Sequence, residues 1–266
     1  MFADELRRVY RRPRNLVILL LVAVVPVLLG VVVKVGGGPR HGGGPPFFAE
    51  ITQNAVFLPV AALASMEALI IPLTVAIVSG DALAGDAANG SLRYLLVRKL
   101  GRVRILNAKA ISALVFTLTI AAVIAGVGLV LGFVLFPGGQ LVTLSGQAVS
   151  VGGGILDVVL AMLLVGVSMF SVAMVGIAVS SFTSSSLAAA SIALTVAVAS
   201  EVISAIPQLS GIRPALLSNY WGSYVDLFRS PMVLGGVFKD LLEQAGWSIV
   251  FYAIAVLNFG QRDILT

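Results

Sequence analysis

Six long runs of apolar residues constrain this chain more than any other feature of its sequence. They occupy residues 16–33, 56–78, 110–136, 155–182, 187–206 and 241–260. About 20 mostly apolar residues in a helix cross the hydrocarbon core of a bilayer, and a helix satisfies its own backbone hydrogen bonds there. We therefore predict an all-α integral membrane protein, with residues 1–266 forming one transmembrane domain of six transmembrane helices.

Composition supports this class and excludes several kinds of site. Hydrophobic residues make up 59% of the chain and charged residues only 11%, whereas soluble domains carry roughly 25% charged residues. Cysteine is absent, which excludes disulfides and thiolate metal sites. The one histidine, His41, lies in a Gly/Pro-rich loop, so we predict no metal site, no catalytic residues and no bound cofactor.

The uncharged run from Val158 to Ser200 is too long for a single span. It contains a cluster of hydroxyl residues at 180–186, which can satisfy backbone groups in a tight turn. We predict a helix hairpin there, because no base that could activate a serine nucleophile lies nearby in the sequence.

Basic residues predict the orientation, because Lys and Arg in short loops favour the cytoplasmic side. Twelve fall on one side of a six-span arrangement: Arg7, Arg8, Arg11, Arg12, Arg14, Arg93, Arg98, Lys99, Arg102, Arg104, Lys109 and Arg262. Five fall on the other: Lys34, Arg40, Arg213, Arg229 and Lys239. This distribution predicts a multi-pass protein with both termini cytoplasmic, and the membrane is expected to be that of a prokaryotic cell. It also explains the net charge of +5 without nucleic acid.

Two basic elements are expected at the cytoplasmic face. Residues 2–12 place Phe2, Leu6 and Val9 at helical spacing, which predicts an interfacial amphipathic helix in contact with membrane lipids. The loop at 79–109 carries apolar residues at three- and four-residue steps, typical of an amphipathic helix. These are Leu92, Leu95, Leu96, Leu100, Val103 and Leu106.

This loop resembles the first cytoplasmic loop of ABC-2 type transporter permeases, the membrane subunits of ABC exporters. The matching residues are Asp81, Gly85-Asp86, Gly90-Ser91-Leu92, Leu95-Leu96, Arg102 and Lys109. Asp86 stands where the family has Glu, Ser91 where it has Thr, and residues 99–101 replace its Pro-Val-Ser turn. The order of spans and loops along the whole chain is also similar to that family.

The resemblance implies a transmembrane permease subunit of an ATP-driven exporter, with a lipidic, amphipathic or drug-like substrate. No Walker A pattern occurs in the chain, so ATP and Mg²⁺ would bind two separate ATPase subunits. A second permease subunit, identical or different, would complete the assembly. The resemblance assigns ATPase coupling, through a helix between spans two and three, to Asp81, Asp86, Gly90, Ser91, Leu92, Leu95, Leu96, Arg98, Arg102 and Lys109.

Three carboxylates fall within predicted spans, where acidic groups are costly and usually face protein or water. Glu67 lies at the centre of the second span, between Pro59 and Pro72, which are expected to kink that helix. It could contact a cationic substrate, carry a proton, or pack as a structural polar group. Glu201 follows a small-residue stripe (Ala189, Ala193, Ala197) suited to close helix packing, and Gly128 and Gly132 form a similar pair. Asp157 is expected near the outer interface, where exposure to water costs little.

The outer segment at 208–240 contains Tyr220, Trp221, Tyr224 and Phe228. Aromatic residues favour the membrane interface, so we expect short outer-leaflet helices between spans five and six. They could gate substrate exit or form a passive aromatic belt.

A second functional class remains open. A stand-alone secondary transporter could use Glu67 for proton coupling, although such proteins usually show internal repeats and broken helices, and no repeat is evident. An intramembrane enzyme is disfavoured, because the chain lacks the histidines for metal chemistry and any serine–base pair.

Overall fold

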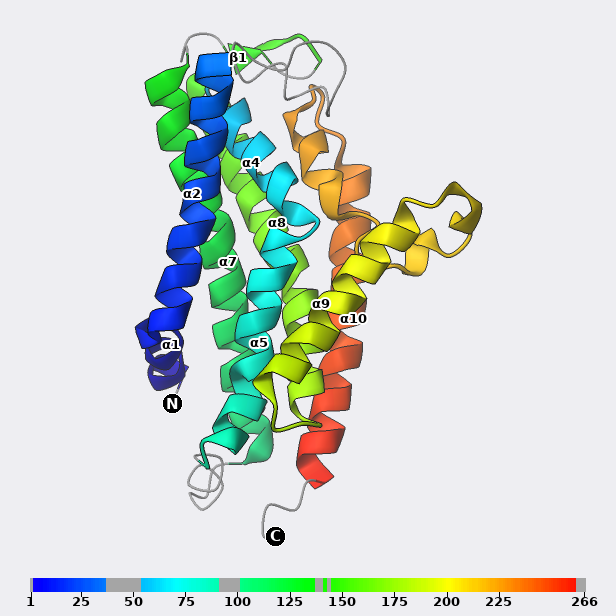
Figure 1. Ribbon diagram of the computed structural model, residues 1–266. Coiled ribbons are helices and arrows are strands. Elements are labelled where there is room, and N and C mark those ends of the chain that lie inside the picture. The colour runs from blue at the N-terminus through cyan, green and yellow to red at the C-terminus, as the bar shows by residue number, and fades with distance from the viewer. Residues whose placement is uncertain (1, 37–53, 91–100, 137–140, 143–144, 262–266) are drawn as a thin grey trace.

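The computed structural model of the protein (Figure 1) describes residues 2–36, 54–90, 101–136, 141–142 and 145–261. Its α-helices are α1 (Phe2–Arg11), α2 (Pro13–Gly36), α4 (Phe57–Glu67), α5 (Ile70–Ala88), α7 (Arg102–Leu135), α8 (Val151–Ser180), α9 (Ser186–Ser204) and α10 (Leu234–Gln261). Six of them, α2, α5, α7, α8, α9 and α10, are long and apolar enough to cross a membrane. The predicted six-span, all-α membrane fold is therefore confirmed.

The helices form an elongated bundle with α8 at its centre, in contact with α5, α7, α9 and α10. Helix α1 and the last turn of α10 lie at the same end of the bundle, which we call the terminal end (Figure 1). A short antiparallel ribbon of β1 (Leu141–Val142) and β2 (Ala148–Val149) lies at the opposite end, the ribbon end. An even number of crossings places both ends of the chain on one side, as the distribution of basic residues predicts.

The outer faces of the bundle are apolar, as contact with lipid requires. Helix α2 exposes Leu20, Leu21 and Val32, while Ile18 and Val22 on its other face are buried. Helix α7 has 34 residues and is therefore about 51 Å long at the usual helical rise, longer than the ~30 Å hydrocarbon core.

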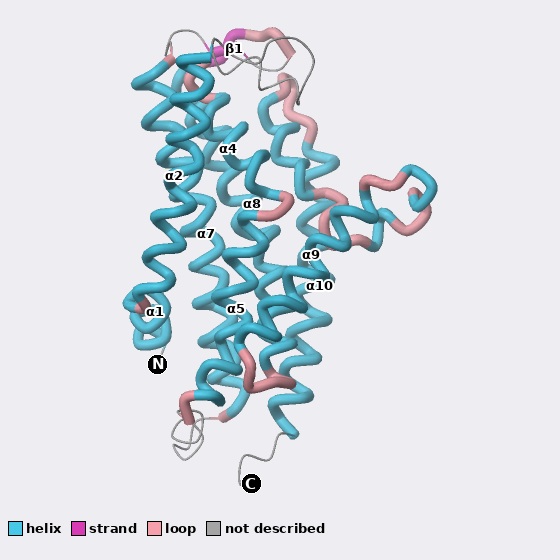
Figure 2. The backbone as a smooth tube through the Cα atoms, viewed as in Figure 1, coloured by secondary structure: helices cyan, strands magenta, loops and turns pink. Residues whose placement is uncertain are grey.

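The predicted second span is broken into two helices. Helix α4 ends at Glu67 and α5 begins at Ile70, so that Ala68 and Leu69 form a turn about midway along the bundle (Figure 2). Pro72 is the third residue of α5. In a continuous helix its ring would clash with the carbonyl of Ala68, four residues earlier, so the chain breaks at that position. The sequence predicts a kink here, and the structure has a complete interruption.

The terminal-end loop is shorter than predicted, because the flanking helices extend into it. Helix α5 continues to Ala88, where Gly90 turns the chain with a φ of +66°, and α7 begins at Arg102. The predicted loop residues Asp81, Asp86 and Lys109 therefore belong to helices. Residues 91–100, which include Ser91, Leu92, Leu95, Leu96 and Arg98, lie outside the described residues.

Small residues produce the close helix packing that the sequence predicts. Ala189, Ala193 and Ala197 of α9 are completely buried, and α9 packs on α5. Gly128 and Gly132 of α7 face α4, where a Cβ on Gly128 would lie 2.7 Å from the Cα of Pro59. Ser180 ends α8 and Ser185 caps α9 by accepting a hydrogen bond from the Ala188 backbone N–H at 3.2 Å, so the predicted hairpin is confirmed.

The segment after α9 projects from the side of the bundle, coloured yellow in Figure 1. The connection from α9 to α10 forms three 3₁₀-helices, η1 (Pro207–Leu209), η2 (Arg213–Ala215) and η3 (Trp221–Phe228), of which η3 packs on α8 and α10. Trp221, Tyr224 and Phe228 are buried against the bundle, so these aromatic side chains do not form an exposed belt within this chain. The position of η1–η3 relative to a membrane leaflet stays a prediction.

Candidate functional site

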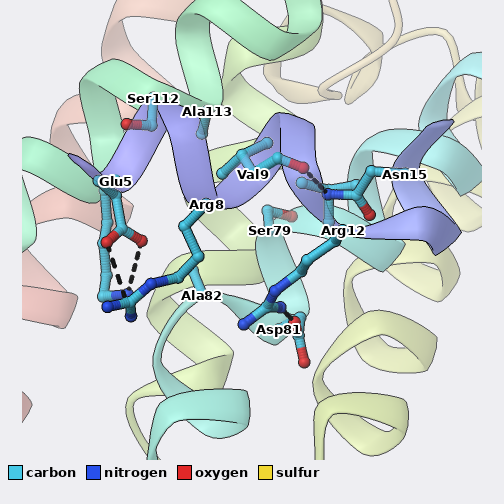
Figure 3. A pocket seen from close by; sticks show the side chains of 12 residues that line it. Glu5, Arg8, Val9, Arg12, Asn15, Ser79, Asp81, Ala82, Ser112 and Ala113 are labelled. Atoms are coloured by element: carbon cyan, nitrogen blue, oxygen red, sulfur yellow. Dashed lines mark hydrogen bonds and ion pairs between the residues drawn. The ribbon is translucent and has the colours of Figure 1, made fainter. Parts of the chain in front are cut away.

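At the terminal end, buried ion pairs join three helices around Lys109 of α7. The Lys109 ammonium lies 2.6 Å from Asp86 Oδ2 of α5 and 2.9 Å from Glu5 Oε1 of α1. Arg8 adds a second cation, with Nη1 3.2 Å from Asp86 Oδ1 (Figure 3 shows Arg8 beside Glu5). Lys109 and Asp86 are only 4% and 2% exposed, so they depend on one another for charge compensation.

Asp81 forms a second set of contacts, about one and a half turns before Asp86 in α5. It pairs with Arg12, as Figure 3 shows, and with Arg14, whose Nη2 lies 3.1 Å from Asp81 Oδ2. Ser186 at the start of α9 donates its hydroxyl to Asp81 Oδ1 at 2.6 Å. We call the set Glu5, Arg8, Arg12, Arg14, Asp81, Asp86 and Lys109 the terminal junction.

Helix α1 is further held in place by two hydrogen bonds outside the ion pairs. Asn15 Nδ2 donates to the Val9 carbonyl at 2.8 Å, and the hydroxyls of Tyr10 and Thr119 share a hydrogen bond. Burial raises the pKa of the Tyr10 phenol, more than the bond to Thr119 lowers it, so Tyr10 stays neutral at physiological pH. The amphipathic helix predicted at 2–12 is thus docked on α2 and α7.

A small cavity of about 30 Å³ lies inside the terminal junction. Glu5, Arg12, Ser79 and Ser112 contribute to its wall, together with apolar residues of α1, α5 and α7 (Figure 3). The Ser112 hydroxyl is buried and makes no hydrogen bond to the described residues. A polar cavity of this size has room for an ordered water that would satisfy it.

Only some residues to which the resemblance assigns ATPase coupling are described. Asp81, Asp86 and Lys109 are buried in the terminal junction, so they cannot meet a partner protein directly. Arg102 donates from Nη1 to the carbonyls of Phe259, at 3.1 Å, and Gly260, which caps the end of α10. A role of Asp81, Asp86, Arg102 and Lys109 in ATPase coupling stays a prediction, and it would act through the helices that these residues hold together.

A second polar region lies beside the break between α4 and α5. Its acidic residues are Glu67 at the end of α4, Asp240 and Glu243 in the first turns of α10, and Glu201 near the end of α9. Glu201 and Asp240 lie close enough to Glu67 to repel its charge, and Asp240 in turn repels Glu243. We call these four residues the acidic cluster.

Asp240 is fully buried and has neutral hydrogen-bond partners only. Ser168 donates its hydroxyl to Asp240 Oδ2, and Gln244 donates from Nε2 to Asp240 Oδ1 at 3.1 Å. The Gln244 amide also donates to the Leu217 carbonyl at 2.9 Å and accepts from Ser171. This network attaches α10 to α8 and to the segment preceding η3.

Several polar atoms in the same region have no hydrogen-bond partner among the described residues. They are Glu67 Oε1, Trp221 Nε1, the Ser223 and Tyr224 hydroxyls, and both carboxylate oxygens of Glu243. The Tyr224 hydroxyl lies beside the Glu67 carboxyl without the geometry of a hydrogen bond. Buried polar groups are normally satisfied, so this concentration of unsatisfied atoms marks the region as a candidate binding site.

Of the three predicted intramembrane carboxylates, the structure brings two together. Glu67 and Glu201 belong to the acidic cluster, whereas Asp157 lies on α8 11 residues from Ser168, about 16 Å along the helix axis. Asp157 is also 7% exposed, which corrects its expected exposure to water. Sequence reasoning missed Asp240, Gln244 and Tyr224. Asp240 and Gln244 share a helix face with i,i+4 spacing, and this polar pair is a signal that could have identified them.

The comparisons with known proteins correct the predicted family. A family model described as "Protein of unknown function (DUF2705)" matches residues 47–265, and no ABC-2 family model matches. The resemblance to ABC-2 permeases, which depended on a short motif in the loop and on the order of the spans, is therefore wrong as a family assignment. No curated protein matches the chain.

Proposed function

We propose, for this chain that belongs to the DUF2705 family, a role as the transmembrane subunit of a transporter powered by a separate ATP-hydrolysing protein. One observation carries the proposal: α5 connects the two polar regions. One end of α5 is fixed to α1 and α7 through Asp86 and Lys109, and the other end meets the break beside Glu67. The 89–101 segment therefore joins α7 to α5, and α5 leads to the break beside Glu67.

This arrangement suits the transmission of force. A partner that moves the 89–101 segment would displace α5 and α7 together, because the Lys109–Asp86 ion pair joins them at 2.6 Å. The interruption at Ala68 and Leu69 lacks continuous helical hydrogen bonds, so it is the natural hinge for α5. Movement at the terminal end would then change the surroundings of Glu67.

The proposal places the terminal end in the cytoplasm of a prokaryotic cell. Arg7, Arg11 and Arg104 are exposed there, which agrees with the enrichment of cytoplasmic loops in basic residues. The partners would be two ATPase subunits, which bind ATP and Mg²⁺, and a second transmembrane subunit. Membrane lipids would surround the assembly. The expected substrate is lipidic, amphipathic or drug-like, and the expected direction is export.

The test is copurification of ATPase activity with the tagged chain from its native membranes in a mild detergent. We expect ATP hydrolysis in the purified material, and we expect its loss when Leu95→Asp and Leu96→Asp are combined. Val97→Asp, a change in the same segment but off the apolar stripe, is the matched control and should retain activity. Purified material without ATPase activity, or an unaffected double variant, contradicts the proposal.

A second candidate function is proton-coupled transport by the chain alone. The observation that favours it is the buried Glu67 carboxyl, with an unsatisfied Oε1, at a broken helix, the type of site that secondary transporters place near the middle of the bilayer. Proteoliposomes containing only this chain distinguish the two functions. Substrate accumulation driven by an imposed pH gradient and abolished by Glu67→Gln would favour the second, whereas no accumulation without an ATPase favours the first.

A further inference from the structure

The acidic cluster contains four carboxyl side chains without a basic side chain paired to them. No salt bridge involves Glu67, Glu201, Asp240 or Glu243 within the described ranges of the chain. Two basic residues of nearby segments are engaged elsewhere: Arg229 pairs with Asp226 at 2.8 Å, and the Lys239 ammonium lies 5.9 Å from the centre of the Tyr220 ring. Buried charges in proteins are normally paired, so a cation is the complement that this region lacks.

Buried aromatic side chains of η3 lie near the same region. Tyr224 is fully buried with its hydroxyl beside Glu67, and Trp221 is 2% exposed with an unsatisfied indole N–H. Phe228, in the last turn of η3, packs against Phe57 of α4 with 6.1 Å between ring centres. Carboxylates together with aromatic rings are the groups that hold organic cations, through charge and through cation–π contact.

The break between α4 and α5 supplies access from the side of the bundle. Ser65, Ala68 and Leu69 are exposed, and Leu69 retains 52% of its accessible surface although it lies next to the buried Glu67. Irregular backbone at membrane depth is tolerated where it is covered by protein or lines a polar path. An exposed break therefore favours a route that leads to the acidic cluster.

We propose that the acidic cluster binds a lipophilic organic cation, with the Glu67 carboxylate opposing its positive charge and the Trp221 and Tyr224 rings against its apolar surface. A metal ion is disfavoured, because no group of three or more His, Cys, Asp or Glu side chains is placed to hold one among the described residues. The inference rests on the proposed transport function and names the substrate class for it.

Two probes of the same shape and opposite charge test the proposal: tetraphenylphosphonium and tetraphenylborate. Binding of each is measured by equilibrium dialysis with the purified full chain in dodecylmaltoside. We expect the wild-type chain to bind the cation and not the anion, and we expect Glu67→Gln to weaken cation binding at least tenfold. Asp226→Asn removes a partly exposed acidic group of η3 that pairs with Arg229, so it is the matched control and should bind like wild type.

A second measurement needs no variant and covers the case in which Glu67→Gln does not fold. Dicyclohexylcarbodiimide labels carboxyl groups in apolar surroundings, and mass spectrometry locates the labelled residue. We expect tetraphenylphosphonium, and not tetraphenylborate, to protect Glu67 from labelling. Equal binding of both probes, unchanged affinity in Glu67→Gln, or labelling of Glu67 that the cation does not reduce would overturn the proposal.

The outcome is separable from the test of the proposed function, because binding in detergent requires no ATPase. Failure to bind the cation while ATPase activity copurifies removes this inference alone. Cation binding without a copurifying ATPase removes the ATP-driven function and leaves the site in place for the proton-coupled alternative.

Discussion

The two polar regions of this protein differ in how their charges are compensated. In the terminal junction every acidic side chain faces a cation, with Lys109 shared between Asp86 and Glu5 at 2.6 and 2.9 Å. In the acidic cluster, Glu67 faces other acidic groups and a tyrosine. Paired buried charges hold a structure together, whereas unpaired ones cost free energy unless a ligand or a proton joins them. The difference separates a structural joint from a candidate binding site.

The two regions are also joined differently to the helices around them. The terminal junction links α1, α5 and α7 through side chains, and α1 is tied to α2 by Asn15 as well. The acidic cluster lies where the main chain itself is interrupted, at Ala68 and Leu69. A rigid end and a hinge on the same helix are what a mechanical coupling between them requires.

Removing the shared cation of the terminal junction should have the largest effect. Lys109→Met leaves Asp86 and Glu5 buried without their main partner, and breaking a buried ion pair costs about 3–5 kcal/mol. Unfolding of the purified chain by sodium dodecyl sulfate from dodecylmaltoside micelles measures the loss. Lys34→Met is the control, because Lys34 is exposed and its contacts among the described residues are a hydrogen bond to the Leu135 carbonyl and a cation–π contact with Phe136. A similar loss of unfolding free energy in both variants would show that the ion pairs of the terminal junction contribute little to stability.

The second-largest effect on stability is expected at the contact between α7 and the short helix α4, which ends at the break. Gly128→Ala places a Cβ 2.7 Å from the Pro59 Cα, and overpacking of this kind costs about 1–3 kcal/mol. Gly126→Ala, two residues away on α7, meets nothing within 4 Å and should be neutral or stabilising. The same unfolding assay compares them. If Gly128→Ala is as stable as Gly126→Ala, α4 is free to move away from α7.

A smaller effect is expected at the end of α10. Arg102→Ala removes the cap on the Phe259 and Gly260 carbonyls, where a cation is worth about 0.3–1 kcal/mol. Hydrogen exchange of the last turn of α10 should become faster, while that of α8 stays unchanged. Arg104→Ala, an exposed arginine two residues away on the same helix, should leave α10 unaffected. Unchanged exchange in Arg102→Ala would show that α10 is held by packing alone.

The spans were predictable from the sequence because hydropathy is a local property. The runs at 16–33 and 187–206 correspond closely to α2 and α9, and the hydroxyl cluster at 180–186 marks the hairpin between α8 and α9. The small-residue stripes also indicated which helix faces pack. The start of α10 was placed too late, since Lys239, Asp240 and Glu243 lower its hydropathy although the backbone is already helical.

The polar regions were less predictable because they depend on tertiary pairing. Glu67 stood out as a carboxylate in an apolar run, but nothing local indicates that Lys109 meets Asp86 and Glu5, which lie 23 and 104 residues away. Likewise, Ser168 and Ser171 become partners of Asp240 and Gln244 only when α10 packs on α8. The loop motif resembled a known family, and the family match contradicts that resemblance.

The most direct test of the difference between the two regions is to neutralise one carboxylate in each. Asp86→Asn and Glu67→Gln both replace a buried acid by its amide, and detergent-driven unfolding of the two variants measures the stability of each. We expect Asp86→Asn to lose about 2 kcal/mol or more, because Lys109 and Arg8 lose a compensating charge, and we expect Glu67→Gln to change by less than about 0.5 kcal/mol. An equal loss of stability in the two variants would contradict the account.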